Sequence, residues 1–206
     1  MTCSRHFLRR SSAAFVTAFL ALLAMLLSAT ASQAQEFTLQ FDHAQTKIEY
    51  SLGSTLHTVH GTFALKNGTV RVDPSSGKLD GSILVDALSG DSGNADRDGR
   101  MHREIIESAT FPEIVFTPVK MTGTLAATGS SKVDVSGQFR LHGQEHEVTI
   151  PIEVKTDGEN LQISAHFEIP YVQWGLKNPS NFLLHVSHSV VIDVRATGRM
   201  QTGEKR

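Results

Sequence analysis

The side chains of this sequence that are best suited to bind a metal are its histidines. There are ten of them, but their spacing is unfavourable. On an extended strand, residues three apart point to opposite faces, so such pairs cannot share a metal ion. The pairs with this spacing are His57 with His60 and His185 with His188. His142 and His146 share a face, but the turn at Gly143 separates them, and no His-Glu-x-x-His motif is present. The sequence therefore predicts no zinc site.

An acidic stretch offers a second kind of metal chemistry. Residues 94–99, NADRDG, imitate the first half of an EF-hand loop, in which alternate oxygen ligands and a glycine at the sixth position wrap a calcium ion. The twelfth position should supply a bidentate glutamate, but it is Ile105, and Glu104 comes one place early. Arg97 and Arg100 would add positive charge beside the cation. We therefore expect no calcium site and no other metal.

Nucleophilic catalysis has no better support. The single cysteine, Cys3, lies at the extreme N-terminus, and the chain has no Gly-x-Ser-x-Gly motif in which a serine could be both exposed and activated. The carboxylates of residues 96–107 alternate with arginines, which makes them a poor acid and base pair. The sequence predicts no catalytic residue, and we expect a protein that is not an enzyme.

The charged stretch is better explained as one short amphipathic helix. Asp96 and Asp98 suit a helix N-terminus, and Met101 and Ile105 lie one turn apart on one face. Two i,i+4 pairs support it, Arg100 with Glu104 and Arg103 with Glu107. The pair Phe111-Pro112 is predicted to end the helix. Such a helix between strands either closes an open barrel end or packs on the sheet as a connector, and the sequence leaves both open.

Strands must carry almost everything else, because apolar and polar residues alternate with a period of two. Strands are predicted at residues 37–41, 47–56, 59–73, 79–87, 113–121, 132–141, 147–154, 161–169 and 186–194. Asn67-Gly68 is either a hairpin turn or a bulge in one long strand. Pro151 lacks an amide proton in mid-strand, which favours an edge position or a bulge. Eight or nine short strands predict an all-β antiparallel barrel or sandwich.

The N-terminus is typical of export. Arginines precede an uncharged run over residues 13–27, and small residues follow, which predicts a signal peptide at 1–34 and one domain at 35–206. The run is too short for a spanning helix. Cleavage after Ala34 removes three arginines and no carboxylate, so the net charge falls from −2 to −5 and nucleic acid is excluded as a partner. We expect a periplasmic or secreted protein without disulfides.

Several segments, in this order, resemble the YceI-like family of exported isoprenoid-binding proteins. They are TKIEYSL at 46–52, HTVHGTF at 57–63, Asp73-Pro74, Arg97-Asp98, ESATFPEIVF at 107–116, and the strands around Leu141-His142-Gly143. The similarity covers about residues 37–198 and departs over 171–181. The resemblance implies a lipocalin-like antiparallel β-barrel with a helical segment and a long apolar channel, and it favours one long bent strand through Asn67-Gly68.

The resemblance also implies a lipid-binding function, in which the barrel sequesters or carries a polyisoprenoid or quinone-like chain without a cofactor. Parity along the strands and helix then gives the inward, ligand-binding positions. These are Ile48, Tyr50, Leu52, Phe63, Leu65, Ile83, Val85, Met101, Ile105, Phe116, Phe139 and Trp174. Transient contact with a membrane or a membrane protein, and a homodimer, stay open. The alternative is a non-catalytic β-sandwich with a filled core that meets a protein partner.

Overall fold

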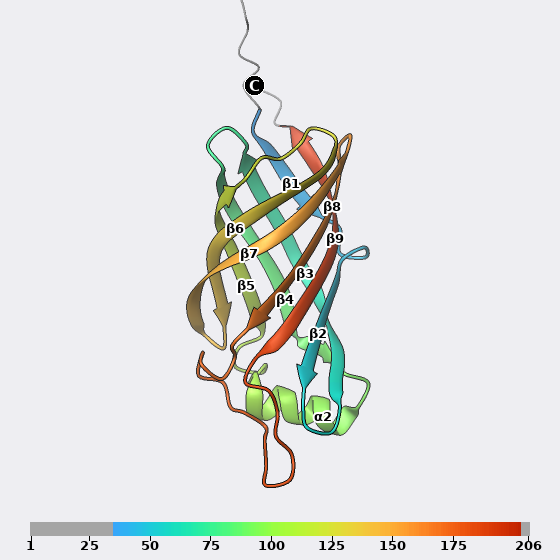
Figure 1. The fold of residues 1–206 in the computed structure, drawn as a ribbon, viewed down its shortest axis with the longest axis vertical. Coiled ribbons are helices and arrows are strands. Elements are labelled where there is room, and N and C mark those ends of the chain that lie inside the picture. Colours follow the sequence, from blue (N-terminus) through green and yellow to red (C-terminus); the bar gives the residue numbers. More distant parts are fainter. Residues whose placement is uncertain (1–34, 203–206) are drawn as a thin grey trace, which may run out of the picture. The chain divides into compact units, whose positions relative to one another are not determined.

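The structure, a computed structural model, describes residues 35–202, so the predicted signal peptide at 1–34 lies outside the described residues. Within residues 35–202, no helix is long and apolar enough to cross a membrane. Figure 1 shows long tilted strands that wrap around one axis, with a short helix at one end. The strands are β1 (Phe37–Phe41), β2 (Lys47–Gly53), β3 (Thr58–Asp73), β4 (Lys78–Asp91), β5 (Glu113–Thr122), β6 (Gly129–Leu141), β7 (Gln144–Asp157), β8 (Asn160–Ile169) and β9 (Val190–Thr202).

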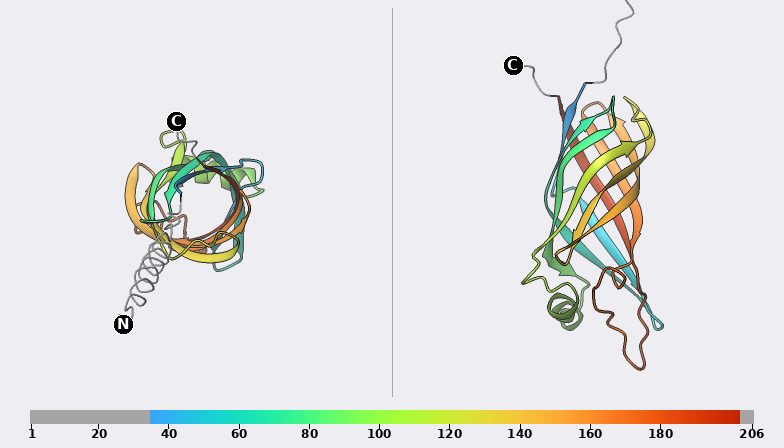
Figure 2. Two further views of the ribbon diagram at one scale, coloured as in Figure 1. Left: turned by 90° about the horizontal axis from the view of Figure 1, so that it is seen from above. Right: turned by 90° about the vertical axis from the view of Figure 1, so that its left-hand side faces the viewer.

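The nine strands form a single antiparallel sheet that closes on itself. Its order is β1-β3-β2-β9-β8-β7-β6-β5-β4, and β4 also pairs with β3. Strands β1 and β2 share one position between β3 and β9: β1 pairs with Val72 and Met200 near one end, and β2 pairs with Phe63 and Val194 near the other. The sheet is therefore a barrel with eight strand positions, seen down its axis in Figure 2. This confirms the predicted barrel with one short helix and excludes the sandwich.

The ambiguity at Asn67-Gly68 resolves as a bulge. Strand β3 runs without a break from Thr58 to Asp73, and its register against β4 shifts between Leu65 and Asn67. A Cβ added at Gly68 would lie 2.9 Å from Cδ2 of Phe41, so glycine lets the Phe41 ring pass over the backbone. The long bent strand β3 thus forms part of the wall along the full length of the barrel.

Pro151 lies where two strands separate. Strand β7 pairs with β8 only from Ile152 onward, whereas its pairing with β6 continues through Pro151. Pro151 therefore lies at the point where β7 leaves β8 and has a strand partner on one side only, which is the edge position that the sequence suggests. The segment that follows β8 lies against this part of β7, because the Trp174 ring stacks on His146 with centroids 4.1 Å apart.

The last strand differs from its prediction. Strand β9 spans Val190–Thr202 rather than residues 186–194. Val186 makes only an isolated bridge to Ser54, so the alternation across 186–189 continues the strand pattern without a strand. Residues beyond 194 extend β9 and pair with both β8 and β1.

The helix is shorter than predicted and is wound in two ways. Helix α2 (Ala95–Arg100) is capped by the side chain of Asn94, which accepts from the Arg97 N–H, and a π-helical segment, η1 (Met101–Ile105), continues it. The prediction that Phe111-Pro112 ends the helix is wrong, because Glu107 already has a left-handed backbone with φ 50°. The turn at Glu107 also prevents the predicted Arg103 pair, and the Glu107 carboxylate instead lies 3.5 Å from His142 Nε2.

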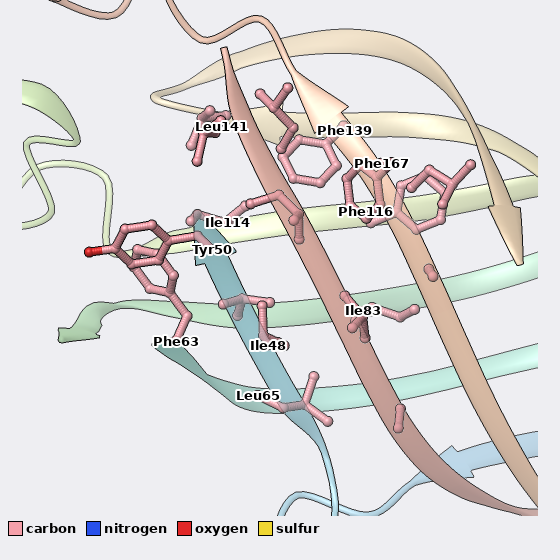
Figure 3. A pocket seen from close by; sticks show the side chains of 18 of the residues that line it. Ile48, Tyr50, Phe63, Leu65, Ile83, Ile114, Phe116, Phe139, Leu141 and Phe167 are labelled. Atoms are coloured by element: carbon pink, nitrogen blue, oxygen red, sulfur yellow. The ribbon is translucent and has the colours of Figure 1, made fainter. Parts of the chain in front are cut away.

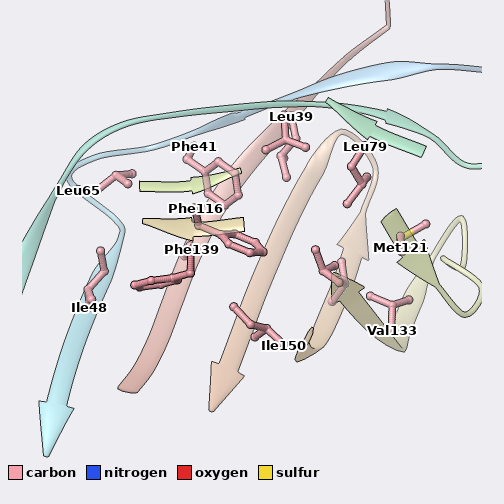
Figure 4. Close-up of a cluster of buried hydrophobic side chains, with 14 of the residues drawn as sticks. Leu39, Phe41, Ile48, Leu65, Leu79, Phe116, Met121, Val133, Phe139 and Ile150 are labelled. Carbon is pink, nitrogen blue, oxygen red and sulfur yellow. The ribbon is translucent and has the colours of Figure 1, made fainter. Parts of the chain in front are cut away.

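Apolar side chains from all strands point inward. Figure 4 shows part of this buried cluster, in which Leu39, Phe116 and Ile150 come from different strands but face the same interior. An apolar wall of this kind either packs against itself or surrounds a hollow, and the barrel does the second.

Candidate ligand-binding cavity

The barrel encloses a cavity of about 540 Å³. Its volume lies in the range of small-molecule sites, which is about 300–1,000 Å³. Figure 3 shows aromatic and aliphatic side chains from strands all round the barrel directed into this space, among them Ile83, Phe116 and Phe167. The lining runs the length of the barrel, from Phe37, Leu79 and Leu161 at one end to residues of the helix at the other. The period-two alternation of apolar residues in the strands therefore builds a tube rather than a packed core.

Accessibility to water gives independent evidence for the hollow. In β8, the inward side chains Ile163, Ala165 and Phe167 stay half-buried although they line the cavity, as do Ile192 and Val194 in β9. A filled core would bury such side chains almost completely. These inward side chains are therefore not fully packed, which agrees with a barrel that has room for a ligand.

The structure places eleven of the twelve predicted positions on the cavity wall. They are Ile48, Tyr50, Leu52, Phe63, Leu65, Ile83, Val85, Met101, Ile105, Phe116 and Phe139. Trp174 is the exception, because it is not among the lining residues. It follows β8 in an irregular segment where strand parity gives no direction, and it packs between His146 and Phe139, with the Phe139 centroid 5.7 Å away. Trp174 thus packs against the inward-facing Phe139 without lining the cavity itself.

Sequence reasoning missed the lining residues of two other regions. At the end away from the helix, the wall includes Leu39, Val72 and Val135, which the same alternation could have identified. At the helix end, the loop between β8 and β9 contributes Pro179, Leu184 and Val186. Val186 continues the alternation of the following strand, but no periodicity marks Pro179 and Leu184, whose only signal is a short apolar cluster in an otherwise polar segment.

Polar side chains concentrate at the helix end of the cavity. Ser54 and His57 come from the turn between β2 and β3, and Arg97 and Arg100 come from helix α2. Thr46 also lines the cavity, but its hydroxyl donates to the Asp42 carbonyl oxygen at 2.6 Å. The cavity is therefore amphipathic along its axis, with one wholly apolar end and one end where charged groups meet the solvent.

The helix is held against β4 by a glycine and a histidine. A Cβ at Gly90 would lie 2.7 Å from Cε of Met101 and 2.7 Å from Cε1 of Phe63, so glycine makes room for both side chains. The His102 ring links Nε2 to the Gly90 carbonyl oxygen and Nδ1 to the Ser108 hydroxyl, each at 3.0 Å. Ser108 is buried, so this link is shielded from water. Met101 and Ile105 are thereby directed into the cavity, and the helix helps to close the barrel, as the first of the two sequence interpretations holds.

The EF-hand-like residues are used in the helix N-terminus. The Asp98 carboxylate accepts from the Ser92 hydroxyl and from the Ser92 N–H, the latter at 3.0 Å. Arg97 donates from Nε to the Ser92 hydroxyl at 2.7 Å. Burial raises the pKa of Asp98, but the hydrogen bonds from Ser92 and the nearby Arg97 charge outweigh it and lower the pKa overall. The Asn94 side chain caps the helix, so the oxygens of Asn94 and Asp98 accept hydrogen bonds that stabilise the fold.

An ion-pair network joins the helix to the loop that follows β8. Lys177 Nζ and Arg100 Nε each lie 3.3 Å from Oε2 of Glu104. Hydrogen bonds from Lys177 and then from Arg100 lower the pKa of Glu104. Tyr171 fixes the same loop by donating to the Ser187 carbonyl oxygen at 2.7 Å, and burial raises the pKa of Tyr171 to about 12. The loop therefore has a defined position over the cavity mouth.

The histidines near this end do not converge on a common point. The His142 ring contacts Phe111, with centroids 4.4 Å apart, whereas His146 stacks on Trp174. Among residues 35–202, no group of three His, Cys, Asp or Glu side chains is placed to hold a metal ion.

Comparison with known proteins agrees with this architecture. A sequence model of the YceI-like domain matches residues 39–198. A UPF0312 protein of Pseudomonas savastanoi pv. phaseolicola is 28% identical over 143 residues, which are 67% of this chain and 69% of that protein. Among solved structures, Burkholderia cenocepacia BcnA has a TM-score of 0.64 at 17% identity and covers 76% of this chain and 98% of its own. A polyisoprenoid-binding domain from Saccharophagus degradans, described as implicated in plant cell wall breakdown, has a TM-score of 0.61 at 17% identity and covers 79% and 98%.

Proposed function

Because the chain belongs to the YceI-like family, and because its barrel surrounds an apolar hollow, we propose that it binds an apolar lipid and sequesters or carries it. The proposed ligand is a polyisoprenoid or a quinone with an isoprenoid tail. The observation that carries the proposal is the cavity of about 540 Å³ with an almost entirely apolar wall. The polyisoprenoid-binding domain of similar fold supports the same ligand class.

Burial of the tail supplies the affinity. Each CH₂ group removed from water contributes about 0.8 kcal/mol, so a tail of several isoprene units binds firmly without a specific polar contact. The half-buried inward side chains, such as Ile163 and Phe167, are the surfaces that gain contacts when the tail enters. Selectivity then depends on the length and bulk of the tail.

The polarity of the cavity orients the ligand. The tail occupies the wholly apolar end near Leu79 and Leu161, and the head group lies at the helix end near His57 and Arg100. In this orientation no polar group of the ligand is left without a partner in an apolar environment. The helix segment η1 contacts the ligand at the helix end through Met101 and Ile105.

The proposed role includes export and excludes a chemical step. The signal-peptide pattern of residues 1–34 supports a periplasmic or secreted location. In this role the ligand enters and leaves with all its bonds intact. A protein that takes up an isoprenoid and releases a cleaved product would contradict this part of the proposal.

A blocked cavity tests the proposal. Ala165 lines the cavity and its neighbour Ser164 is exposed on the outer face, so Ala165→Phe and Ser164→Phe place the same ring on opposite sides of one strand. Delipidated protein is titrated with a short-chain, water-soluble ubiquinone, and the fluorescence of Trp174 is followed. We expect saturable quenching in the wild type and in Ser164→Phe, and at least tenfold weaker binding in Ala165→Phe. Equal binding by both variants would refute the cavity as the site.

Native mass spectrometry of the purified protein, followed by organic extraction, identifies the ligand. We expect a mass adduct that disappears on extraction and is recovered as an intact isoprenoid. A purified protein that carries no adduct and, after delipidation, shows no quenching on titration would refute the proposal.

A further inference from the structure

We propose that the two loop tips at the helix end form a membrane-docking surface, through which the protein touches a lipid bilayer while the cavity mouth faces it. The inference rests on the proposed function, because it names the place where the apolar ligand enters and leaves. The docking tips are defined as Leu56, in the turn between β2 and β3, and Phe182 and Leu183, in the loop between β8 and β9.

The docking tips hold the three most exposed large apolar side chains of the described residues. Phe182 is 96% exposed, Leu183 is 82% exposed and Leu56 is 76% exposed. They make up three of the five large apolar side chains that residues 35–202 leave exposed, the others being Leu88 and Val119 on strands. Single exposed apolar residues are ordinary on protein surfaces, but a group of three at one end is unusual.

The two loops that carry the docking tips lie side by side. The Thr55 N–H donates to the His185 carbonyl oxygen at 3.0 Å, and the Ser187 N–H donates to the Gly53 carbonyl oxygen at 2.9 Å. Ser54 and Val186 form a β-bridge between them. Figure 1 shows the loop between β8 and β9 projecting beyond helix α2, next to the end of the β2–β3 hairpin, and Figure 2 agrees from the side.

The exposure of Phe182 and Leu183 is built into the loop. The Asn181 side-chain oxygen accepts from the Leu183 and Leu184 N–H groups, each at 2.9 Å. The backbone N–H of Asn181 donates to the Leu184 carbonyl oxygen, also at 2.9 Å. The Ser180 hydroxyl accepts from the Val186 N–H at 2.8 Å. This tight turn directs Leu184 towards the cavity and leaves the two preceding side chains outside. The exposure of two large apolar side chains to water has an unfavourable free energy, and contact with a bilayer removes it.

Charge selects a bilayer as the partner. The chain has 21 acidic residues, yet none lies in residues 51–62 or in residues 169–192, the two segments that carry the docking tips. The only charged residue in these segments is Lys177, and four histidines accompany it. Carboxylates are repelled by anionic lipid head groups, and the two segments that carry the docking tips contain none. The acidic residues of the remaining surface therefore keep the rest of the barrel away from the bilayer.

The docking surface is continuous with the cavity mouth. Leu184 and Val186 line the cavity within three residues of Leu183, and Ser54 and His57 line it on either side of Leu56. A lipid that leaves the bilayer at the docking tips therefore meets apolar lining at once and crosses little water. The geometry is that of other interfacial binders, in which a few apolar side chains enter the head-group region while the rest of the protein stays in water.

Flotation with lipid vesicles tests the inference. The vesicles consist of phosphatidylethanolamine and phosphatidylglycerol and contain no isoprenoid, so binding reports docking and not cargo uptake. Burial of one Phe or Leu side chain changes an equilibrium constant by about tenfold or more. We expect the wild-type protein to float with the vesicles and the double variant Phe182→Ser, Leu183→Ser to bind about 100-fold more weakly. The matched control is Val119→Ser, which removes a similarly apolar side chain that is 54% exposed on β5 and should bind as the wild type does.

A second measurement separates this inference from the proposed function. Titration with the water-soluble ubiquinone should give the same affinity for the wild type and the double tip variant, which also shows that the variant is folded. Flotation of the wild type without any quinone binding would leave docking intact and refute the cargo proposal. A wild type that binds the quinone but does not float would overturn docking alone. Docking would also be overturned by a tip variant that floats like the wild type. It would likewise be overturned if sedimentation shows that the wild type is a dimer and that the tip variant is a monomer, because the tips would then be buried between the two copies.

Discussion

Filling the hollow of the barrel should leave the empty protein as stable as before or make it more stable. Ala165→Phe adds an aromatic ring to a half-buried, inward position of β8. In a filled core, such an insertion costs roughly 1–3 kcal/mol because the surrounding side chains must move. In the barrel, the ring enters existing space and gains contacts with the opposite wall. We expect the free energy of unfolding of the delipidated protein to rise by about 0–2 kcal/mol, since full burial of a Phe side chain is worth about 1.5–3 kcal/mol.

The size of the hollow shows why the sign of this change in the free energy of unfolding is informative. Cavities made by truncating core residues cost about 24 cal/mol per Å³, so a dry space of about 540 Å³ would cost about 13 kcal/mol by this scale. This upper bound equals the whole stability of an ordinary domain, about 5–15 kcal/mol. The empty barrel is therefore the less stable form, and a side chain that occupies part of the hollow replaces some of what the ligand provides.

Urea unfolding of delipidated protein, followed by circular dichroism, measures this effect. The matched control is Ala87→Phe, because Ala87 is 0% exposed in β4 and does not line the cavity. We expect the control to lose at least 1–3 kcal/mol by overpacking. If Ala165→Phe loses as much as Ala87→Phe, then the interior is packed and the reasoning from the hollow fails.

Three further predictions concern the ligand and the helix end. Extraction of the bound lipid should lower Tm, and readdition at a thousandfold excess over Kd should restore about 4 kcal/mol, as seen by differential scanning calorimetry; an unchanged Tm would contradict cavity binding. Gly90→Ala should displace Met101 and cost about 1–3 kcal/mol in urea unfolding, whereas Gly99→Ala, in helix α2 against the flexible end of an arginine, should be neutral or stabilising by up to about 1 kcal/mol. Because the folded-state pKa of Glu104 is lowered, its ion pair with Lys177 stabilises above the ordinary pKa of 4.5 and is lost as the pH falls through the lowered value. The protection of the loop after β8 against hydrogen exchange, relative to the intrinsic rate at each pH, should therefore fall only in acid in the wild type but already at neutral pH in Glu104→Gln. Equal protection in both at neutral pH would refute the link.

Most of the barrel follows from local sequence because each strand carries its own signal. Alternation in β6, for example, assigns Val133, Val135 and Phe139 to one face without knowledge of any other strand. Closure of the sheet gives these faces a common interior, which is why parity placed nine of the candidate positions on the cavity wall, and helical spacing added Met101 and Ile105.

The remaining features depend on contacts between distant segments. The second half of β9 has a weak apolar signal because two of its inward positions, Ala196 and Gly198, are small, and a Cβ at Gly198 would lie 2.5 Å from Cδ1 of Leu39. Trp174 was assigned inward, but its position depends on the separation of β7 from β8, which no local pattern encodes. The early end of the helix depends on Glu107, whose left-handed backbone a sequence pattern does not predict.

Because β1 and β2 share one position in the sheet, the barrel is closed along its whole length only after β1 has paired with β9. Strand β1 joins the C-terminal half of β9, so the seam that completes the ring brings together the first and the last strands of the domain. Contacts of such sequence separation form slowly, since a long loop must close first. During synthesis, the strands from β2 to β8 can pair as an open, curved sheet whose apolar face is exposed to water. Whatever keeps that face from aggregating must therefore act until residue 202 has emerged.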